Sequence, residues 1–218
     1  LYPHLKGGQV LIDMSSIDPG VSREIGEKLA EKQVGMLDAP VSGGEPKAVD
    51  ATLSFMVGGQ DALFRQYAPL LKTMGRTVTY CGPLGAGNTV KLANQMIVAA
   101  NIAAAAEGLM LARRNGVSPE TVFHAVRGGL AGSAVMEAKV PMMLRNDTQP
   151  GFRIRLHIKD LKNALRAAAD SGSPAPLSSV VMQQLLAVQE AGFSEADHSA
   201  IAKYYEALTG ETLYEPDL

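Results

Sequence analysis

The chain has 218 residues, 46% of them hydrophobic and 19% charged, with a formal net charge of −2. This composition is typical of a folded globular protein and argues against nucleic acid as the main partner, because phosphate binding requires concentrated lysine and arginine. The only cysteine, Cys81, excludes an internal disulfide. We therefore expect a reducing compartment, and a cytoplasmic location.

The first part of the chain alternates short apolar runs with helical patterns. Four runs predict strands, at Val10–Asp13, Gly35–Ala39, Leu53–Val57 and Thr77–Cys81. Asp18 followed by Pro19 predicts the start of a helix that ends near residue 33, and Asp61–Met74 has helical periodicity. Pro40–Asp50 is rich in glycine, proline and small polar residues and is predicted as a loop. Residues 1–82 are therefore predicted as an α/β domain.

After Gly85 no strand pattern remains, so residues 83–218 are predicted as an all-helical domain. A long helix is expected from about 87 to 115. Its apolar part carries Asn101 and Glu107, which favours a buried helix over a membrane span, and we expect no membrane partner. Five further helices are expected, at about 119–127, 133–144, 157–171, 176–190 and 197–208.

The junction between the two parts contains a candidate site. Lys91, Asn94 and Gln95 have i, i+3, i+4 spacing and share one helical face, where an ammonium and two amides could hold and protonate a polar substrate. The alternative is a solvated lysine, but apolar neighbours make that costly. Gly82–Thr89 is similar to a nucleotide phosphate loop, except that Asn88 stands where that loop requires lysine.

Other polar positions could bind ligands. Consecutive glycines after a serine, Ser42-Gly43-Gly44, can expose N–H groups to an anion, although an ordinary turn is the alternative. Ser16 follows the carboxyl end of the first strand, where open α/β sheets bind ligands, or lies in a plain connecting loop. Lys159 could simply lie on a solvent-exposed helix face. The four histidines lack metal-binding spacing, and no metal is predicted.

Four stretches in this order resemble the β-hydroxyacid dehydrogenase family, which includes 3-hydroxyisobutyrate and 6-phosphogluconate dehydrogenases. They are Leu11–Pro19, Asp38–Ala48, Gly85–Gln95 and His157–Leu165. Arg127–Val135, Gly151–Leu161 and Ala196–Ala200 are most similar to the branch that reduces 2-hydroxy-3-oxopropionate (tartronate semialdehyde). The resemblance extends from residue 1 to about residue 209. It implies a partial Rossmann-type α/β domain followed by an all-α domain for substrate binding and oligomerisation.

The resemblance also implies roles for individual residues. Lys91 would be the general acid and base, and Asn94 would hold the substrate hydroxyl or carbonyl. Ser42, Gly43 and Gly44 would bind the substrate carboxylate. Ser16 would contact the nicotinamide or its ribose, and Lys159 would close over the cofactor. The implied cofactor is NAD or NADP, with NADH favoured, and the implied reaction is the reduction of tartronate semialdehyde to glycerate by a homo-oligomer, a dimer or tetramer.

The family pattern opens with a strand, a G-x-G-x-x-G turn and a helix, and this sequence contains no such segment. About 80 residues of the pattern, roughly one mononucleotide-binding half, would precede residue 1. We expect a part of a longer protein, whereas the alternative is a truncated chain that does not bind cofactor normally. Two other functions stay open: a dehydrogenase of 3-hydroxyisobutyrate or another short β-hydroxyacid, and a non-catalytic helical oligomerisation module.

Overall fold

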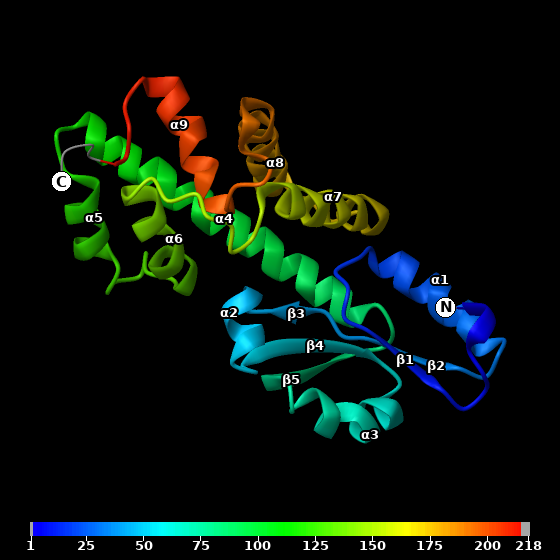
Figure 1. Cartoon of the computed structure of the whole chain (residues 1–218). Coiled ribbons are helices and arrows are strands. Elements are labelled where there is room, and N and C mark those ends of the chain that lie inside the picture. Colours follow the sequence, from blue (N-terminus) through cyan, green and yellow to red (C-terminus); the bar gives the residue numbers. More distant parts are fainter. Residues whose placement is uncertain (1, 215–218) are drawn as a thin grey trace. The chain divides into compact units, whose positions relative to one another are not determined.

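The computed structural model describes residues 2–214, so the last four residues of the predicted helical domain lie outside it. Two compact units are present (Figure 1). The first unit comprises the chain up to Asn94 together with Asn163–Pro174, and the second comprises Gln95–Lys162 and the chain from Ala175 onward. These two units differ from the predicted domains, residues 1–82 and 83–218, and those domain boundaries stay a prediction. Each unit is described by itself.

The first unit is built on a mixed five-stranded sheet. Its strands are β1 (Val10–Asp13), β2 (Gly35–Asp38), β3 (Val41–Ser42), β4 (Leu53–Gly59) and β5 (Gly75–Gly82). β1 is parallel to β2, and β4 is parallel to β5, whereas β4 runs antiparallel to both β2 and β3. β3 therefore continues the line of β2 along the same edge of β4. Within the described chain, β1 pairs on one side only, and its four residues are half-buried.

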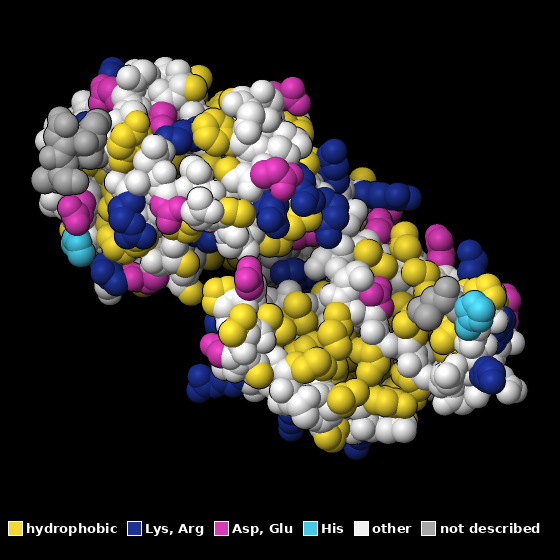
Figure 2. Space-filling view, viewed as in Figure 1, with side chains coloured by type: hydrophobic (Ala, Val, Ile, Leu, Met, Phe, Trp, Pro, Cys, Tyr) yellow, Lys and Arg dark blue, Asp and Glu magenta, His cyan; other side chains and the backbone are white. Residues whose placement is uncertain are grey.

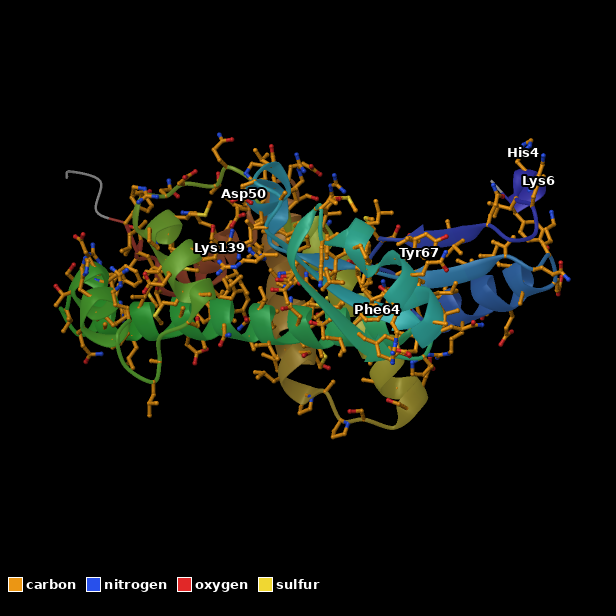
Figure 3. All side chains as sticks on the ribbon, turned by 90° about the horizontal axis from the view of Figure 1, so that it is seen from below. His4, Lys6, Asp50, Phe64, Tyr67 and Lys139 are labelled. Atoms are coloured by element: carbon orange, nitrogen blue, oxygen red, sulfur yellow. The ribbon has the colours of Figure 1, made fainter. Side chains whose placement is uncertain are left out.

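Helices pack against parts of both faces of this sheet. Alternate residues of a strand point to opposite faces, so Met36 and Leu37 of β2 belong to different cores. Met36 packs with Leu29 of α1 (Pro19–Ala30) on one face. Leu37 packs with α3 (Asp61–Leu71) on the other, where Phe64 and Tyr67 also contribute (Figure 3). Figure 2 shows further hydrophobic side chains exposed over the sheet of this unit.

The predicted loop over Pro40–Asp50 is wrong in part. It contains β3 and the short helix α2 (Gly44–Val49). β3 forms because Val41 and Ser42 pair with Phe55 and Ser54 of β4, a long-range ladder that local composition does not reveal. The other strands and helices of this unit lie where the sequence predicts them, within a few residues at their ends.

The second unit is helical. Its elements are most of α4 (Ala86–Arg114), α5 (Pro119–Val126), α6 (Ala134–Leu144), the first part of α7 (Ile154–Ser171), α8 (Pro176–Val188) and α9 (Ala202–Thr209). Residues 198–201, predicted as the start of the last helix, form a separate 3-10 turn, His198–Ile201. By length and composition α4 could cross a membrane. However, it buries Asn88, Lys91 and Gln95, which is the pattern of a core helix.

Candidate active site

Asp38, the last residue of β2, anchors the start of α4. Its carboxylate is fully buried and accepts the backbone N–H of Gly85 at 2.8 Å through Oδ1 and that of Asn88 at 2.7 Å through Oδ2. The first N–H groups of a helix have no partner within the helix, so Asp38 supplies the missing acceptors. Burial raises the pKa of Asp38, the two N–H donors oppose that rise, and the charge of Asp13 adds to it.

Glycine is required where α4 begins because the chain passes very close to the sheet. A Cβ on Gly87 would lie 2.3 Å from the carbonyl oxygen of Met56 and 2.6 Å from that of Asp38. Gly85 has a φ of +90°, which disfavours any other residue. The glycines of this segment therefore place the helix start against β2 and β4.

Asn88 links α4 to the loop that follows β1. Its side chain is fully buried, its Oδ1 accepts the backbone N–H of Ile17 at 3.1 Å, and its Nδ2 donates to Ser22 Oγ at 3.0 Å. Ser16 immediately precedes Ile17 and is half-buried. Asn88 thus ties the loop that carries Ser16 to the first turn of α4.

Lys91 lies one turn beyond Asn88 on the same face of α4. It is only 6% exposed, although lysine is rarely buried without a polar partner or a function. Asn94 is half-buried one turn further along. The helix face predicted to carry Lys91 and Asn94 therefore begins one turn beyond the residues that anchor the start of α4.

Ser42 ends β3, Gly43 connects the strand to α2, and Gly44 is the first residue of α2. Ser42 pairs with Ser54 in the sheet, and Gly43 and Gly44 have φ values of +136° and +67°. Two successive residues in this region require glycine, since a side chain at either position would be strained. The backbone at both glycines is exposed, so its polar groups are open to a ligand.

The predicted site residues fall into two groups. Ser16, Ser42, Gly43, Gly44, Lys91 and Asn94 all belong to the first unit. Two neighbouring residues connect their segments: the Asp38 carboxylate holds the start of α4, and the Ala39 N–H donates to Asp13 O of β1 at 2.7 Å. Lys159 belongs to the second unit.

In the second unit, Lys159 lies near the start of α7 and its Nζ is 2.9 Å from Oδ1 of the buried Asp160. The other oxygen of Asp160 accepts from Gln95 Nε2 at 2.6 Å, and His157 Nε2 is 3.1 Å from the Gln95 carbonyl oxygen. His157 and Asp160 thus hold Gln95 at both its backbone and its side chain. This role of Gln95 differs from substrate binding, the use that its spacing from Lys91 first indicates.

A second buried acid, Asp197, organises the segment before α7. Its carboxylate accepts from Lys139 Nζ at 2.9 and 3.0 Å, and from the backbone N–H groups of Gly151 and Phe152. Burial favours the neutral form, but the charge of His198 and the donors of Ser199, Phe152 and Lys139 outweigh it, so the pKa of Asp197 is lowered. This cluster is structural, and among the described residues no group of three or more His, Cys, Asp or Glu side chains is arranged to hold a metal ion.

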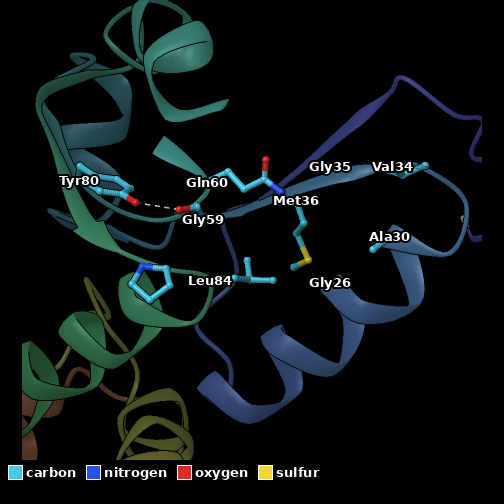
Figure 4. Close-up of a pocket in the computed structure, with 10 residues that line it drawn as sticks. Gly26, Ala30, Val34, Gly35, Met36, Gly59, Gln60, Tyr80 and Leu84 are labelled. Carbon is cyan, nitrogen blue, oxygen red and sulfur yellow. Dashed lines mark hydrogen bonds between the residues drawn. The ribbon is translucent and has the colours of Figure 1, made fainter. Parts of the chain in front are cut away.

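A cavity of about 310 Å³ lies elsewhere in the first unit (Figure 4). It is lined by Gly26 and Ala30 of α1, by Gly35 and Met36 of β2, and by Pro83 and Leu84, which precede Gly85 in the chain. None of the predicted site residues lines it.

Sequence reasoning missed Asp38, Ser22 and the positive role of Asn88. Two features of the sequence could have indicated them: Asp38 is an acid at the end of an apolar strand, and Asn88 is an amide on the same helix face as Lys91. Both residues act through partners far away in the sequence, so local patterns did not reveal their contacts.

A Rossmann-like sheet followed by a helical domain, with polar loops where β1 and β2 end, is typical of nicotinamide-dependent oxidoreductases of two-domain type. Residues 1–82 match the NAD binding domain of 6-phosphogluconate dehydrogenase. Residues 85–205 match the NAD-binding domain of NADP-dependent 3-hydroxyisobutyrate dehydrogenase.

Individual relatives agree. The chain is 38% identical to 2-hydroxy-3-oxopropionate reductase of Escherichia coli over 94% of its own length and 70% of that protein. It is 35% identical to 2-(hydroxymethyl)glutarate dehydrogenase of Eubacterium barkeri over 94% of the chain and 68% of that protein. The structure of 3-hydroxyisobutyrate dehydrogenase from Mycobacterium tuberculosis superposes with a TM-score of 0.86 at 32% identity, covering 93% of this chain and 72% of that one.

The chain belongs to the β-hydroxyacid dehydrogenase family, and it is an NAD(P)-dependent β-hydroxyacid dehydrogenase. The predicted family, the fold class and the cofactor class, NAD or NADP, are confirmed.

Proposed function

We propose that this enzyme reduces tartronate semialdehyde to glycerate with Lys91 as the general acid. The observation that carries the proposal is the burial of Lys91, 6% exposed, on a helix whose start is anchored by Asp38 and Asn88. The 38% identity to the Escherichia coli reductase supports the substrate. The proposal includes a cytoplasmic homo-oligomer acting in glyoxylate metabolism.

The residues of the first unit fit the nicotinamide part of the cofactor. Ser16 lies in the loop after the carboxyl end of β1, held by the neighbouring bond from Ile17 to Asn88, and its hydroxyl suits a neutral amide or ribose hydroxyl. Lys159 would contact the cofactor from α7. When bound, the reduced nicotinamide supplies the hydride.

The side chains of this chain perform the remaining chemistry. As the aldehyde carbon gains a hydride, its oxygen becomes an alkoxide and takes a proton from Lys91 Nζ, leaving a neutral amine that regains a proton from water. Asn94 donates an amide N–H to the substrate oxygen. Ser42 and the N–H groups of Gly43 and Gly44 bind the carboxylate, which fixes the aldehyde relative to Lys91.

The first experiment compares Lys91→Ala with Lys72→Ala, an exposed lysine at the end of α3. Loss of a general acid should lower kcat by about 10²- to 10⁴-fold. Fluorescence titration should show nearly unchanged cofactor affinity, and the Lys72 variant should behave like wild type. A near-normal kcat in Lys91→Ala would rule out the acid role.

The second experiment addresses the substrate. Tartronate semialdehyde carries a hydroxyl group where methylmalonate semialdehyde carries a methyl group. We expect kcat/KM to be about tenfold or more higher for tartronate semialdehyde, which is typical of discrimination by a binding pocket. A preference for methylmalonate semialdehyde would instead identify a 3-hydroxyisobutyrate dehydrogenase. Stable assembly without any turnover or cofactor binding would indicate a non-catalytic oligomerisation module.

A further inference from the structure

The Asn88 side chain bridges two segments that are 71 residues apart in the sequence. We propose that Asn88 is a positioning residue, which holds the Ser16 loop and the Lys91 face of α4 in one register for the paired transfer of hydride and proton. The inference rests on the proposed function. Asn88 itself contacts neither substrate nor cofactor in this scheme.

The contacts of Asn88 are directional and differ in kind. Its oxygen accepts from Ile17, its amide nitrogen donates to Ser22, and its backbone N–H donates to Asp38. A planar amide offers an acceptor and a donor in one fixed arrangement, which neither a carboxylate nor an apolar side chain reproduces. Because Ile17 and Ser22 lie on either side of the helix cap Asp18, the amide fixes the loop and the first turn of α1 together.

The reaction needs such a bridge. Hydride must reach the carbonyl carbon while a proton reaches the adjacent oxygen, so the groups that place the two must be held in register. Ser16 is the residue before Ile17, and Lys91 is one helical turn from Asn88 on the same face. One buried side chain therefore sets the position of both.

The test compares Asn88→Ala and Ser22→Ala with a matched control, Thr89→Ala. Thr89 also makes a hydrogen bond in the first turn of α4, but its Oγ1 donates to Gly85 O at 2.9 Å, within the helix start itself. All variants are made in the protein expressed from its complete gene. Asn88→Ala should lower kcat by about 10- to 100-fold, as expected for a displacement near 1 Å, with a smaller loss in Ser22→Ala.

Two readouts separate positioning from general destabilisation. With cofactor deuterated at the transferred position, the primary isotope effect on kcat should rise in Asn88→Ala because hydride transfer becomes slower, whereas lost folded protein alone would leave it unchanged. Hydrogen exchange of the Ile17 amide should accelerate in Asn88→Ala and stay at the wild-type rate in Thr89→Ala.

The outcomes are distinct. Wild-type protein without reductase activity would overturn the proposed function, while the exchange rate of Ile17 would still test the bridge. Wild-type kcat and isotope effect in both Asn88→Ala and Ser22→Ala, in an active enzyme, would overturn the positioning role. If Asn88→Ala fails to fold, Ser22→Ala decides, because it removes the bond that orients the Asn88 amide. Wild-type kcat, isotope effect and Ile17 exchange in that variant would then overturn the positioning role.

Discussion

Replacing Asp38 tests how the start of α4 is held. In Asp38→Ala, the buried N–H groups of Gly85 and Asn88 lose their acceptors. Each unsatisfied buried donor costs about 1–3 kcal/mol, so we expect a loss of roughly 2–6 kcal/mol in the free energy of unfolding. Asp38→Asn keeps one acceptor oxygen, so only one of the two N–H groups loses its acceptor, and it should cost about 1–3 kcal/mol.

The two Asp38 variants also differ in their dependence on pH. The folded pKa of Asp38 lies above its ordinary value of 3.8 because burial disfavours the carboxylate. A raised carboxyl pKa means that its stabilising contribution is fully present below 3.8 and is lost as the pH rises through the folded value. Asp38→Asn should remove that component.

Urea unfolding followed by circular dichroism at several pH values measures both effects, with an unchanged m-value as the check on two-state behaviour. A cost below about 1 kcal/mol for Asp38→Ala would refute the capping role, given the typical penalty for an orphaned donor. Equal losses of unfolding free energy in Asp38→Ala and Asp38→Asn would refute the reasoning that one retained acceptor oxygen reduces the cost.

Three further results are expected. Lys139→Met leaves the buried Asp197 carboxylate without its cation and should destabilise the fold by about 3–5 kcal/mol in urea unfolding. Because the pKa of Asp197 is lowered, its contribution should be present above its ordinary value and lost as the pH falls below it, and Lys139→Met should weaken that dependence. Burial raises the pKa of Tyr205 to about 12, so stability should fall as the pH rises from its ordinary value toward 12, and Tyr205→Phe should abolish that fall in thermal melts. Gly43→Ala should raise KM for the aldehyde and cost about 1–3 kcal/mol through backbone strain, whereas Gly108→Ala, in an open helical position, should leave both KM and the fold intact.

The sequence predicted those features that depend on neighbouring residues. Asp18 caps α1 by accepting from Gly20 N at 2.7 Å, and Ser133 caps α6 by accepting from Met136 N at 3.0 Å, both as the cap patterns indicate. Four of the five strands of the first unit, β1, β2, β4 and β5, were found because each is a short run of apolar, β-branched or aromatic residues. These features are local, so composition and spacing are enough to reveal them.

The features that escaped prediction are all long-range. β3 exists because it pairs with β4, and the antiparallel direction of β4 against β2 depends on how the chain crosses between them. Asp38 and Gly85 are 47 residues apart, and no periodicity links a carboxyl group to its distant N–H donor. The sequence therefore indicated the face of Lys91 but not what holds that face in place.

The structure explains why Gly82–Thr89 is so similar to a phosphate loop without being one. In a phosphate loop, backbone N–H groups at a helix start bind an anion from outside. Here Gly85 and Asn88 already direct those groups at Asp38, an anion supplied by the chain, and the glycines serve a close approach to β2 and β4. Asn88 stands where a phosphate loop requires lysine, and its side-chain amide instead joins the helix to the Ser16 loop. The same helix start has thus become a fixed base for the helix face that carries Lys91.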